Sequence, residues 1–255
     1  MKNVVFIPNI AVGNGRSTPY HYSVKSWSHW AKKHDVMVLE WTEPVLDTSK
    51  FPIIMQREWV FDILEYNEID YDQVLIVDAD TIVHPDCPNF FLETDYKYSA
   101  VINNGCYEWT TRSISEWGNA MFPDHEHVKT YEYFNTGFVV ANKKHKPFFD
   151  IIKNLYLERG EEIKIHRDRI KASTGQTIVN FLLREHNIET TTLSEAYNLQ
   201  DLFRKNLLHI PNYSWFSDEL HFLKAGWVYH FNAIPKNPRD VEYWMGRTYR
   251  ELYGS

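Results

Sequence analysis

The sequence predicts an α/β protein with a mostly parallel central sheet flanked by helices. The run from Val74 to Val77 is apolar throughout, which is typical of a strand buried on both faces of a parallel sheet. Strand and helix patterns alternate as β-α-β-α-β over about the first ninety residues, the order of a doubly wound parallel sheet. Two carboxylates, Asp78 and Asp80, follow the apolar run directly. Parallel sheets bind their ligands at this end of their strands.

Local periodicity and turn residues predict the individual elements. Strands are expected at residues 4–7, 36–39, 74–77, 99–102, 138–141 and 227–231. Helices are expected at residues 20–33, 53–66, 147–158, 176–185 and 239–252. In the second helix, Trp59, Ile63 and Tyr66 have the spacing of one packed face. A loop rich in Gly, Asn and Ser fills residues 8–19.

The bulk properties narrow the class of protein. A net charge of −7 without a basic stripe argues against a nucleic-acid partner. The chain has two cysteines and no metal-type C-x-x-C, which suits a reducing compartment. It lacks a signal-peptide pattern and any apolar run near the roughly 20 residues of a membrane helix, so we expect a cytoplasmic protein without a transmembrane segment. No internal boundary is visible, so residues 1–255 are expected to form one domain.

The D-x-D pair at the strand end predicts a metal site. Carboxylates spaced i, i+2 beyond a strand can turn toward one divalent cation, and Mg²⁺ and Mn²⁺ take such oxygen ligands. A second D-x-D, Asp70-Tyr71-Asp72, precedes the same strand and is expected to be a solvated turn.

Three further motifs carry polar residues at element ends: the turn with Asn135 and Thr136, the helix start at Gly175-Gln176, and the pair His230 and Lys236 after a strand. Together with the D-x-D, these motifs resemble the retaining GT-A glycosyltransferases. The nearest resemblance is to glycosyltransferase family 8, which includes glycogenin and lipopolysaccharide galactosyltransferases. It covers residues 4 to about 238.

The resemblance implies a role for each matched residue. Asp78 and Asp80 would bind Mn²⁺ (or Mg²⁺) and the nucleotide sugar around Ala79, with His230 as the third protein ligand. Lys236 would contact the donor diphosphate, and Asn135 and Thr136 would line the sugar pocket. Gln176 would lie near the anomeric carbon. The remaining donor contacts would come from Arg57 and from the loop after the first strand, at Pro8, Asn9 and Tyr20.

Two departures from the family pattern bear on the donor. Gly175 stands where the family usually carries an Asp that contacts sugar hydroxyls, and Ala233 replaces a Gly close to the diphosphate.

The implied activity is metal-dependent transfer of a hexose, from UDP-glucose or UDP-galactose, to a hydroxyl of a glycan, lipid-glycan or protein acceptor. The nucleotide would bind to about residues 1–90 and the sugar and acceptor to about 91–255. No carboxylate in the matched motifs is an obvious nucleophile, and the resemblance to this family therefore favours front-face attack with retention.

Two alternatives stay open. Asp78-Ala-Asp80-Thr81 also fits the first motif of haloacid-dehalogenase phosphatases, in which the first Asp is a nucleophile and the second a general acid. That motif normally lies on the first strand of its fold, whereas two βα units precede it here. The loss of the Asp at Gly175 would also fit a degenerate, non-catalytic module that binds sugar nucleotides.

Overall fold

The computed structural model describes residues 2–11, 18–124, 126, 128–208, 219–236 and 239–254. Half of the predicted loop at 8–19 lies outside this set, because residues 12–17 are not described. Within the described ranges, no helix has the length and apolar character needed to cross a membrane. Cys87 and Cys106 are both free thiols.

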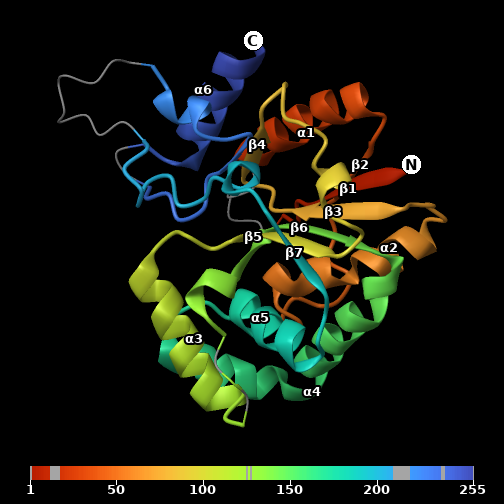
Figure 1. The fold of residues 1–255 in the computed structure, drawn as a ribbon, viewed down its shortest axis with the longest axis vertical. Helices are drawn as coiled ribbons and strands as arrows, with labels where there is room; N and C mark the ends of the chain where they lie inside the picture. The colour runs from red at the N-terminus through yellow and green to blue at the C-terminus, as the bar shows by residue number, and fades with distance from the viewer. Residues whose placement is uncertain are drawn as a thin grey trace.

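A six-stranded sheet in the order β2-β1-β3-β6-β5-β7 forms the centre of the molecule (Figure 1). Its strands are β2 (Met37–Trp41), β1 (Asn3–Pro8), β3 (Gln73–Val77), β6 (Phe134–Asn142), β5 (Tyr98–Ile102) and β7 (Thr190–Leu193). Only β6 runs antiparallel to its neighbours, so the predicted mostly parallel sheet is confirmed. The 74–77 strand is an interior strand, as expected, paired with β1 and β6.

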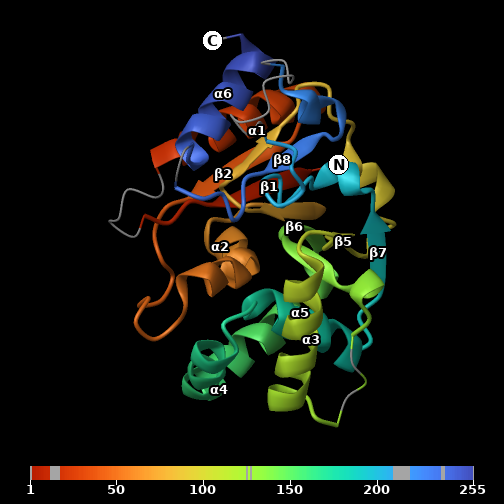
Figure 2. The ribbon, with the colours of Figure 1, turned by 90° about the vertical axis from the view of Figure 1, so that its left-hand side faces the viewer.

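Both faces of the sheet are apolar, which explains the unbroken hydrophobic run in β3. Val74 and Ile76 pack into one core cluster, and the alternate residues Leu75 and Val77 pack into another on the opposite face. Helices cover both faces (Figures 1 and 2). On one side is α1 (His21–His34), and on the other are α2 (Val60–Tyr66), α3 (Tyr107–Met121), α4 (Lys146–Ile170) and α5 (Gly175–Glu185).

The helices differ from the expected ones in three places. Residues 53–66 form a 3-10 helix (Ile53–Trp59) followed by α2, and Tyr66 is 85% exposed instead of sharing the packed face of Ile63. The helix predicted at 147–158 continues to Ile170 past Arg159, whose φ of −115° and ψ of 20° mark a kink. Helix α3 was not predicted, because its polar residues obscure the stripe formed by Ile114, Trp117 and Met121.

A second, two-stranded sheet pairs β4 (Thr81–Val83) with β8 (Val228–His230) in antiparallel register. The strand expected at 227–231 is therefore present, but it pairs with β4, which is too short to be recognised from sequence, and not with the main sheet. A third core cluster joins this sheet to the closing helix α6 (Val241–Tyr253) through Ile82, Tyr229 and Trp244.

Candidate functional site

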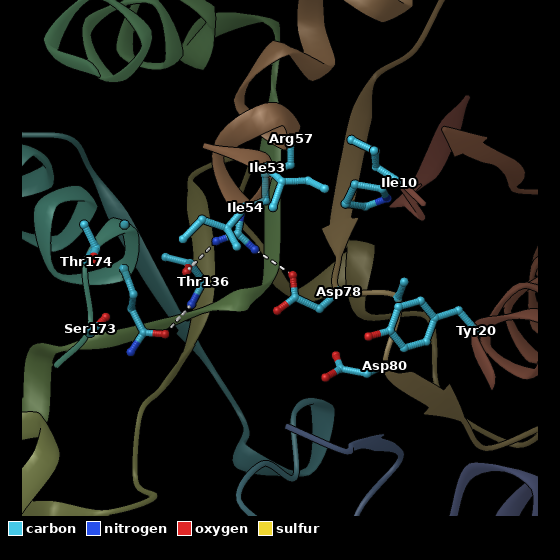
Figure 3. A pocket seen from close by; sticks show the side chains of 14 residues that line it. Ile10, Tyr20, Ile53, Ile54, Arg57, Asp78, Asp80, Thr136, Ser173 and Thr174 are labelled. Carbon is cyan, nitrogen blue, oxygen red and sulfur yellow. Dashed lines mark hydrogen bonds and ion pairs between the residues drawn. The ribbon is translucent and has the colours of Figure 1, made fainter. Parts of the chain in front are cut away.

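A cavity of about 410 Å³ opens at the carboxyl ends of β1 and β3 (Figure 3). This is the edge at which the sheet was expected to bind a ligand. Tyr20 lies at one end of the cavity, and Ser173 and Thr174 lie at the other. The described lining consists of Pro8, Ile10, Tyr20, Ile53, Ile54, Arg57, Asp78, Ala79, Asp80, Thr136, Ser173, Thr174, Gly175 and Gln176.

Asp78, Asp80 and His230 form a compact cluster of possible metal ligands. One ligand atom from each residue lies within 4.8 Å of the other two. The Nε2 atom of His230 is 3.1 Å from Asp80 Oδ1 and 3.6 Å from Asp78 Oδ2. The His230 ring is 3% exposed, whereas the Asp78 side chain is 35% exposed and so remains open to the cavity. His230 therefore meets two aspartates that lie about 150 positions before it in the sequence.

Backbone pairing between β4 and β8 brings His230 to the aspartates. In the antiparallel register His230 lies opposite Thr81, the residue after Asp80. The Phe231 N–H donates to the Asp80 carbonyl at 2.8 Å, so the strand holds the D-x-D turn directly. The small second sheet thus brings His230 next to Asp78 and Asp80.

The charge on His230 depends on its acidic neighbours. Burial alone would lower the pKa of this imidazole, but the carboxylates of Asp80 and Asp78 outweigh burial and raise it. A cation in place of the proton would satisfy the same two carboxylates.

Arg57 links Asp78 to the other wall of the cavity. Its guanidinium donates to Asp78 Oδ1 at 2.6 Å and to Thr136 Oγ1 at 2.8 Å. The other oxygen of Asp78, Oδ2, is the one that faces His230. Asp78 therefore divides its two oxygens between a fixed cation and the ligand cluster.

Arg57 also forms an ion pair with the buried carboxylate of Glu58, a residue that the sequence analysis did not single out. Glu58 is 4% exposed, and its Oε1 lies 3.4 Å from Arg57 Nε. Burial raises the pKa of Glu58, and the adjacent guanidinium opposes that effect. Glu58 was hard to recognise because a glutamate within a helical pattern reads as a solvated residue.

Gln176 and Thr136 meet in the cavity wall. The Thr136 N–H donates to Gln176 Oε1 at 3.2 Å. The Gln176 Nε2 atom is buried and makes no well-formed hydrogen bond with any described residue, although the Gln176 side chain lies close enough to the Tyr133 hydroxyl to oppose the rise in its pKa caused by burial. A buried amide donor without a well-formed hydrogen bond is uncommon, and here it belongs to a residue that lines the cavity. It is therefore suited to bind a ligand oxygen.

Asn135, by contrast, is enclosed in the protein. Its Oδ1 accepts from the Gly137 N–H at 2.9 Å, and its Nδ2 donates to Asn103 at 3.1 Å. Asn135 is therefore part of a buried amide network behind His230, and Thr136 is the member of the pair that lines the cavity.

The four other expected donor contacts have different outcomes. Pro8 and Tyr20 line the cavity, but Asn9 instead donates to Glu40 at 2.6 Å at the edge of the sheet. Lys236 is exposed in a bend after β8 and is not among the described lining residues. Ala233 has a φ of 53°, the left-handed region that favours glycine, so the turn between His230 and Lys236 keeps a glycine-like backbone.

The departure at Gly175 has a steric explanation. A Cβ at this position would lie 2.5 Å from the Sδ atom of Met55, which is fully buried. The thioether thus occupies the space that a larger residue 175 would need. The lining residues Ile10, Ile53, Ile54, Ser173 and Thr174 were also missed, because apolar and hydroxyl residues carry no recognisable motif.

Comparisons with known proteins give a match in structure and none in sequence. No protein-family model matches the chain, and no curated protein sequence matches it significantly. A glycosyltransferase involved in the glycosylation of the major capsid of PBCV-1 matches with a TM-score of 0.62 and 9% identity, over 97% of this chain and 100% of that one. The galactosyltransferase LgtC, in complex with donor and acceptor sugar analogs, matches with a TM-score of 0.54 and 16% identity, over 99% and 95%. The chain has the GT-A glycosyltransferase fold.

A third structural match is the glycosyltransferase GlyE of Streptococcus pneumoniae TIGR4, with a TM-score of 0.53 and 13% identity. That match covers 99% of this chain and 60% of GlyE.

The ligand cluster of this GT-A chain fits a divalent metal ion. Two carboxylates and one imidazole are a donor set that Mn²⁺ accepts, and their ligand atoms are close enough to share one ion. Phosphate oxygens could complete the coordination from the cavity side, where Asp78 and Asp80 are accessible.

Proposed function

We propose that this chain is a metal-dependent glycosyltransferase that transfers a hexose from a nucleoside diphosphate sugar to an acceptor hydroxyl. The observation that carries the proposal is the Asp78–Asp80–His230 cluster beside the cavity of a GT-A fold. A hexosyl transfer requires a diphosphate to leave, and a cation at this cluster would neutralise its growing charge.

Mn²⁺ is the proposed ion, with Mg²⁺ as the second choice. Asp78, Asp80 and His230 would be its protein ligands. An imidazole ligand favours the softer Mn²⁺ over Mg²⁺, which prefers oxygen alone.

The proposed donor is uridine diphosphate glucose or galactose, lying along the length of the cavity. Its base would bind near Pro8, Ile10 and Tyr20, where apolar and aromatic surface is available. Its sugar would lie toward Gln176 and Thr136, where the Nε2 atom of Gln176 can donate to a hydroxyl. Because Met55 occupies the space beside Gly175, the sugar end of the cavity would have fewer polar groups that can hydrogen-bond to the sugar hydroxyls.

Front-face attack by the acceptor, with retention of configuration, is the proposed course of reaction. The only carboxylates among the described lining residues are Asp78 and Asp80. Asp78 is held by Arg57, and Asp80 is held beside His230, so neither is placed as a nucleophile toward the sugar end. The acceptor hydroxyl would come from a glycan, a lipid-glycan or a protein.

Lys236 is proposed to reach the diphosphate when the donor binds. Its position six residues after His230, on the turn with the left-handed Ala233, would let the segment fold across the metal side of the cavity. Its ammonium group would add a second positive charge beside the leaving group.

The test is release of nucleotide from a panel of nucleotide sugars with Mn²⁺, for the unmodified chain and for Asp80→Asn. We expect release from a uridine diphosphate hexose, stopped by excess chelator and lowered more than about a hundredfold by Asp80→Asn, because the leaving group then lacks its Lewis acid.

Asp70→Asn is the matched control. It belongs to the other D-x-D, where Asp70 is exposed and paired only with lysines, and it should leave turnover unchanged. Full activity of Asp80→Asn, or hydrolysis of a phosphomonoester with no turnover of any sugar nucleotide, would contradict the proposal.

A further inference from the structure

The imidazole of His230 is held from behind by an amide. Its Nδ1 atom lies 3.0 Å from Asn198 Oδ1, on the side of the ring away from the aspartates. Both side chains are buried, with exposures of 3% for His230 and 1% for Asn198. The ring therefore has one partner on each nitrogen, and the partner of Nδ1 is not a metal ligand in the proposed site.

The donor and the acceptor of this hydrogen bond can be assigned from the Gly137 N–H, a backbone group that is connected to Asn198 through the side chain of Asn135. The Gly137 N–H can only donate, and it points at Asn135 at 2.9 Å, so that end of Asn135 must be its oxygen. The same oxygen lies 3.0 Å from Asn198, which must therefore present its NH₂ group there. The other end of Asn198, facing His230, is then the carbonyl oxygen, which can only accept.

It follows that Nδ1 of His230 carries a proton. A neutral imidazole has one protonated nitrogen, so its Nε2 then has a free lone pair. Nε2 is the atom that faces Asp80 and Asp78 at 3.1 and 3.6 Å. The network thus selects the tautomer in which the nitrogen beside the carboxylates is the one able to bind a cation.

The backbone around Asn198 fixes its position as well as its direction. The Leu199 N–H donates to the Val228 carbonyl at 2.8 Å, and the His230 N–H donates to the Leu199 carbonyl at 3.0 Å. The segment after Asn198 therefore pairs with β8 on the side opposite to β4. Asn198 and His230 therefore lie on neighbouring segments that are joined by backbone hydrogen bonds.

We propose that Asn198 is a positioning residue that holds His230 in its Nδ1-protonated form and aims Nε2 at a divalent cation. This rests on the metal site of the proposed function. Metal-bound histidines commonly donate their second N–H to an oxygen of the protein, and loss of that partner typically weakens metal binding 10–100-fold. Asn198 is this partner here, and nothing in its own sequence context (a polar residue after Ala196-Tyr197) marks it as such.

Asn103 provides the matched control, because it belongs to the same buried network without touching His230. It accepts from Asn135 at 3.1 Å and donates to Thr110 at 2.8 Å. If the network were only structural support, substitutions at Asn103 and Asn198 would have similar effects.

The experiment is titration calorimetry of the full chain with Mn²⁺ alone, at one pH, with a thermal melt of each variant to establish folding. Asn198→Ala should weaken Mn²⁺ binding 10–100-fold, whereas Asn103→Ala should change it less than about threefold even if it lowers the melting temperature. Asn198→Asp keeps an acceptor for Nδ1–H and should retain most of the affinity. If Asn198→Ala does not fold, Asn198→Leu, which has a similar volume, takes its place.

The outcomes separate this inference from the proposed function. Unchanged Mn²⁺ affinity in Asn198→Ala, or equal losses in Asn198→Ala and Asn103→Ala, would overturn the positioning role and leave the metal site in place. Failure of the unmodified chain to bind Mn²⁺ would overturn both.

Discussion

At Gly137 the site has no space for a side chain, not even for a single Cβ atom. A Cβ on this residue would lie 2.4 Å from His230 Cε1, 2.7 Å from Asp78 Oδ2 and 2.9 Å from Asn135 Oδ1. The backbone of β6 thus passes between two proposed metal ligands and the amide network that supports one of them. Gly137 is required here for close approach, and its backbone angles are not of the left-handed kind.

We therefore expect Gly137→Ala to impair the site. The added methyl group must displace Asp78 or His230, so Mn²⁺ affinity and turnover should each fall by more than about tenfold, measured by calorimetry and by nucleotide release. Gly160→Ala is the control, because a Cβ there meets open space. Normal Mn²⁺ affinity in Gly137→Ala would mean that the ligands are not held as closely as described.

A second residue, His145, is expected to affect stability. It is 8% exposed, its Nδ1 accepts from the Asn142 N–H at 3.1 Å, and burial lowers its pKa from 6.5 to about 4. The unfolded chain thus takes up this proton at a higher pH than the folded chain. The contribution of His145 to stability is complete above about pH 6.5 and is lost as the pH falls toward about 4, by up to about 3 kcal/mol.

Urea unfolding at a series of pH values measures this effect. His145→Gln should flatten the fall in the free energy of unfolding between about pH 6.5 and pH 4, whereas His186→Gln, at an exposed position, should not. Identical pH profiles for the His145 variant and the unmodified chain would rule out this role.

At the scale of elements, the cavity depends on how the start of α5 packs against the 3-10 helix Ile53–Trp59. Gly175 is the first residue of α5 and is covered by Met55 from the other element. The two residues are complementary in size. A side chain at 175 would therefore separate the elements that carry Gln176 and Arg57.

This packing predicts the outcome of introducing an acidic residue at position 175. Gly175→Asp alone should lower the free energy of unfolding by about 1–3 kcal/mol, because it overpacks a buried contact. Adding Met55→Ala should recover part of that loss by freeing the space. Chemical denaturation of the two variants and of Met55→Ala alone tests this, and a double variant no more stable than Gly175→Asp would show that Met55 is not the obstacle.

At the scale of the whole molecule, the site joins parts of the chain that fold into different core clusters. Asp78 follows β3 of the main sheet, Gln176 lies on α5, and His230 lies on the second sheet with α6. A ligand that binds all three connects these parts in the folded state and has no equivalent site in the unfolded chain.

Binding should therefore stabilise the chain as a whole. With the complex of Mn²⁺ and uridine diphosphate at about a hundred times its dissociation constant, the free energy of unfolding should rise by about 2.7 kcal/mol, and chelator should remove the gain. Thermal melts of the unmodified chain, His230→Ala and Asp70→Asn measure it. Only His230→Ala should lose the shift, and an equal shift in that variant would place the metal elsewhere.

The sequence by itself determined the elements whose residues repeat with a clear period and the carboxylates at the end of one of them. In β3 the four residues from Val74 to Val77 are all apolar because both faces of the sheet are covered, and the local sequence pattern shows this burial. Asp78 and Asp80 were identifiable because they follow that pattern directly, and His230 only because its motif resembles a known family.

The tertiary structure alone decided which distant segments meet. The antiparallel direction of β6, the pairing of β4 with β8, and the fit of Met55 against Gly175 all depend on contacts between remote residues. The role of Asn198 also depends on a contact with a remote residue, because a single buried polar residue forms no repeating pattern in the sequence. Local sequence encodes burial and backbone preference, whereas the partner of a strand edge or an amide depends on what the rest of the chain brings beside it.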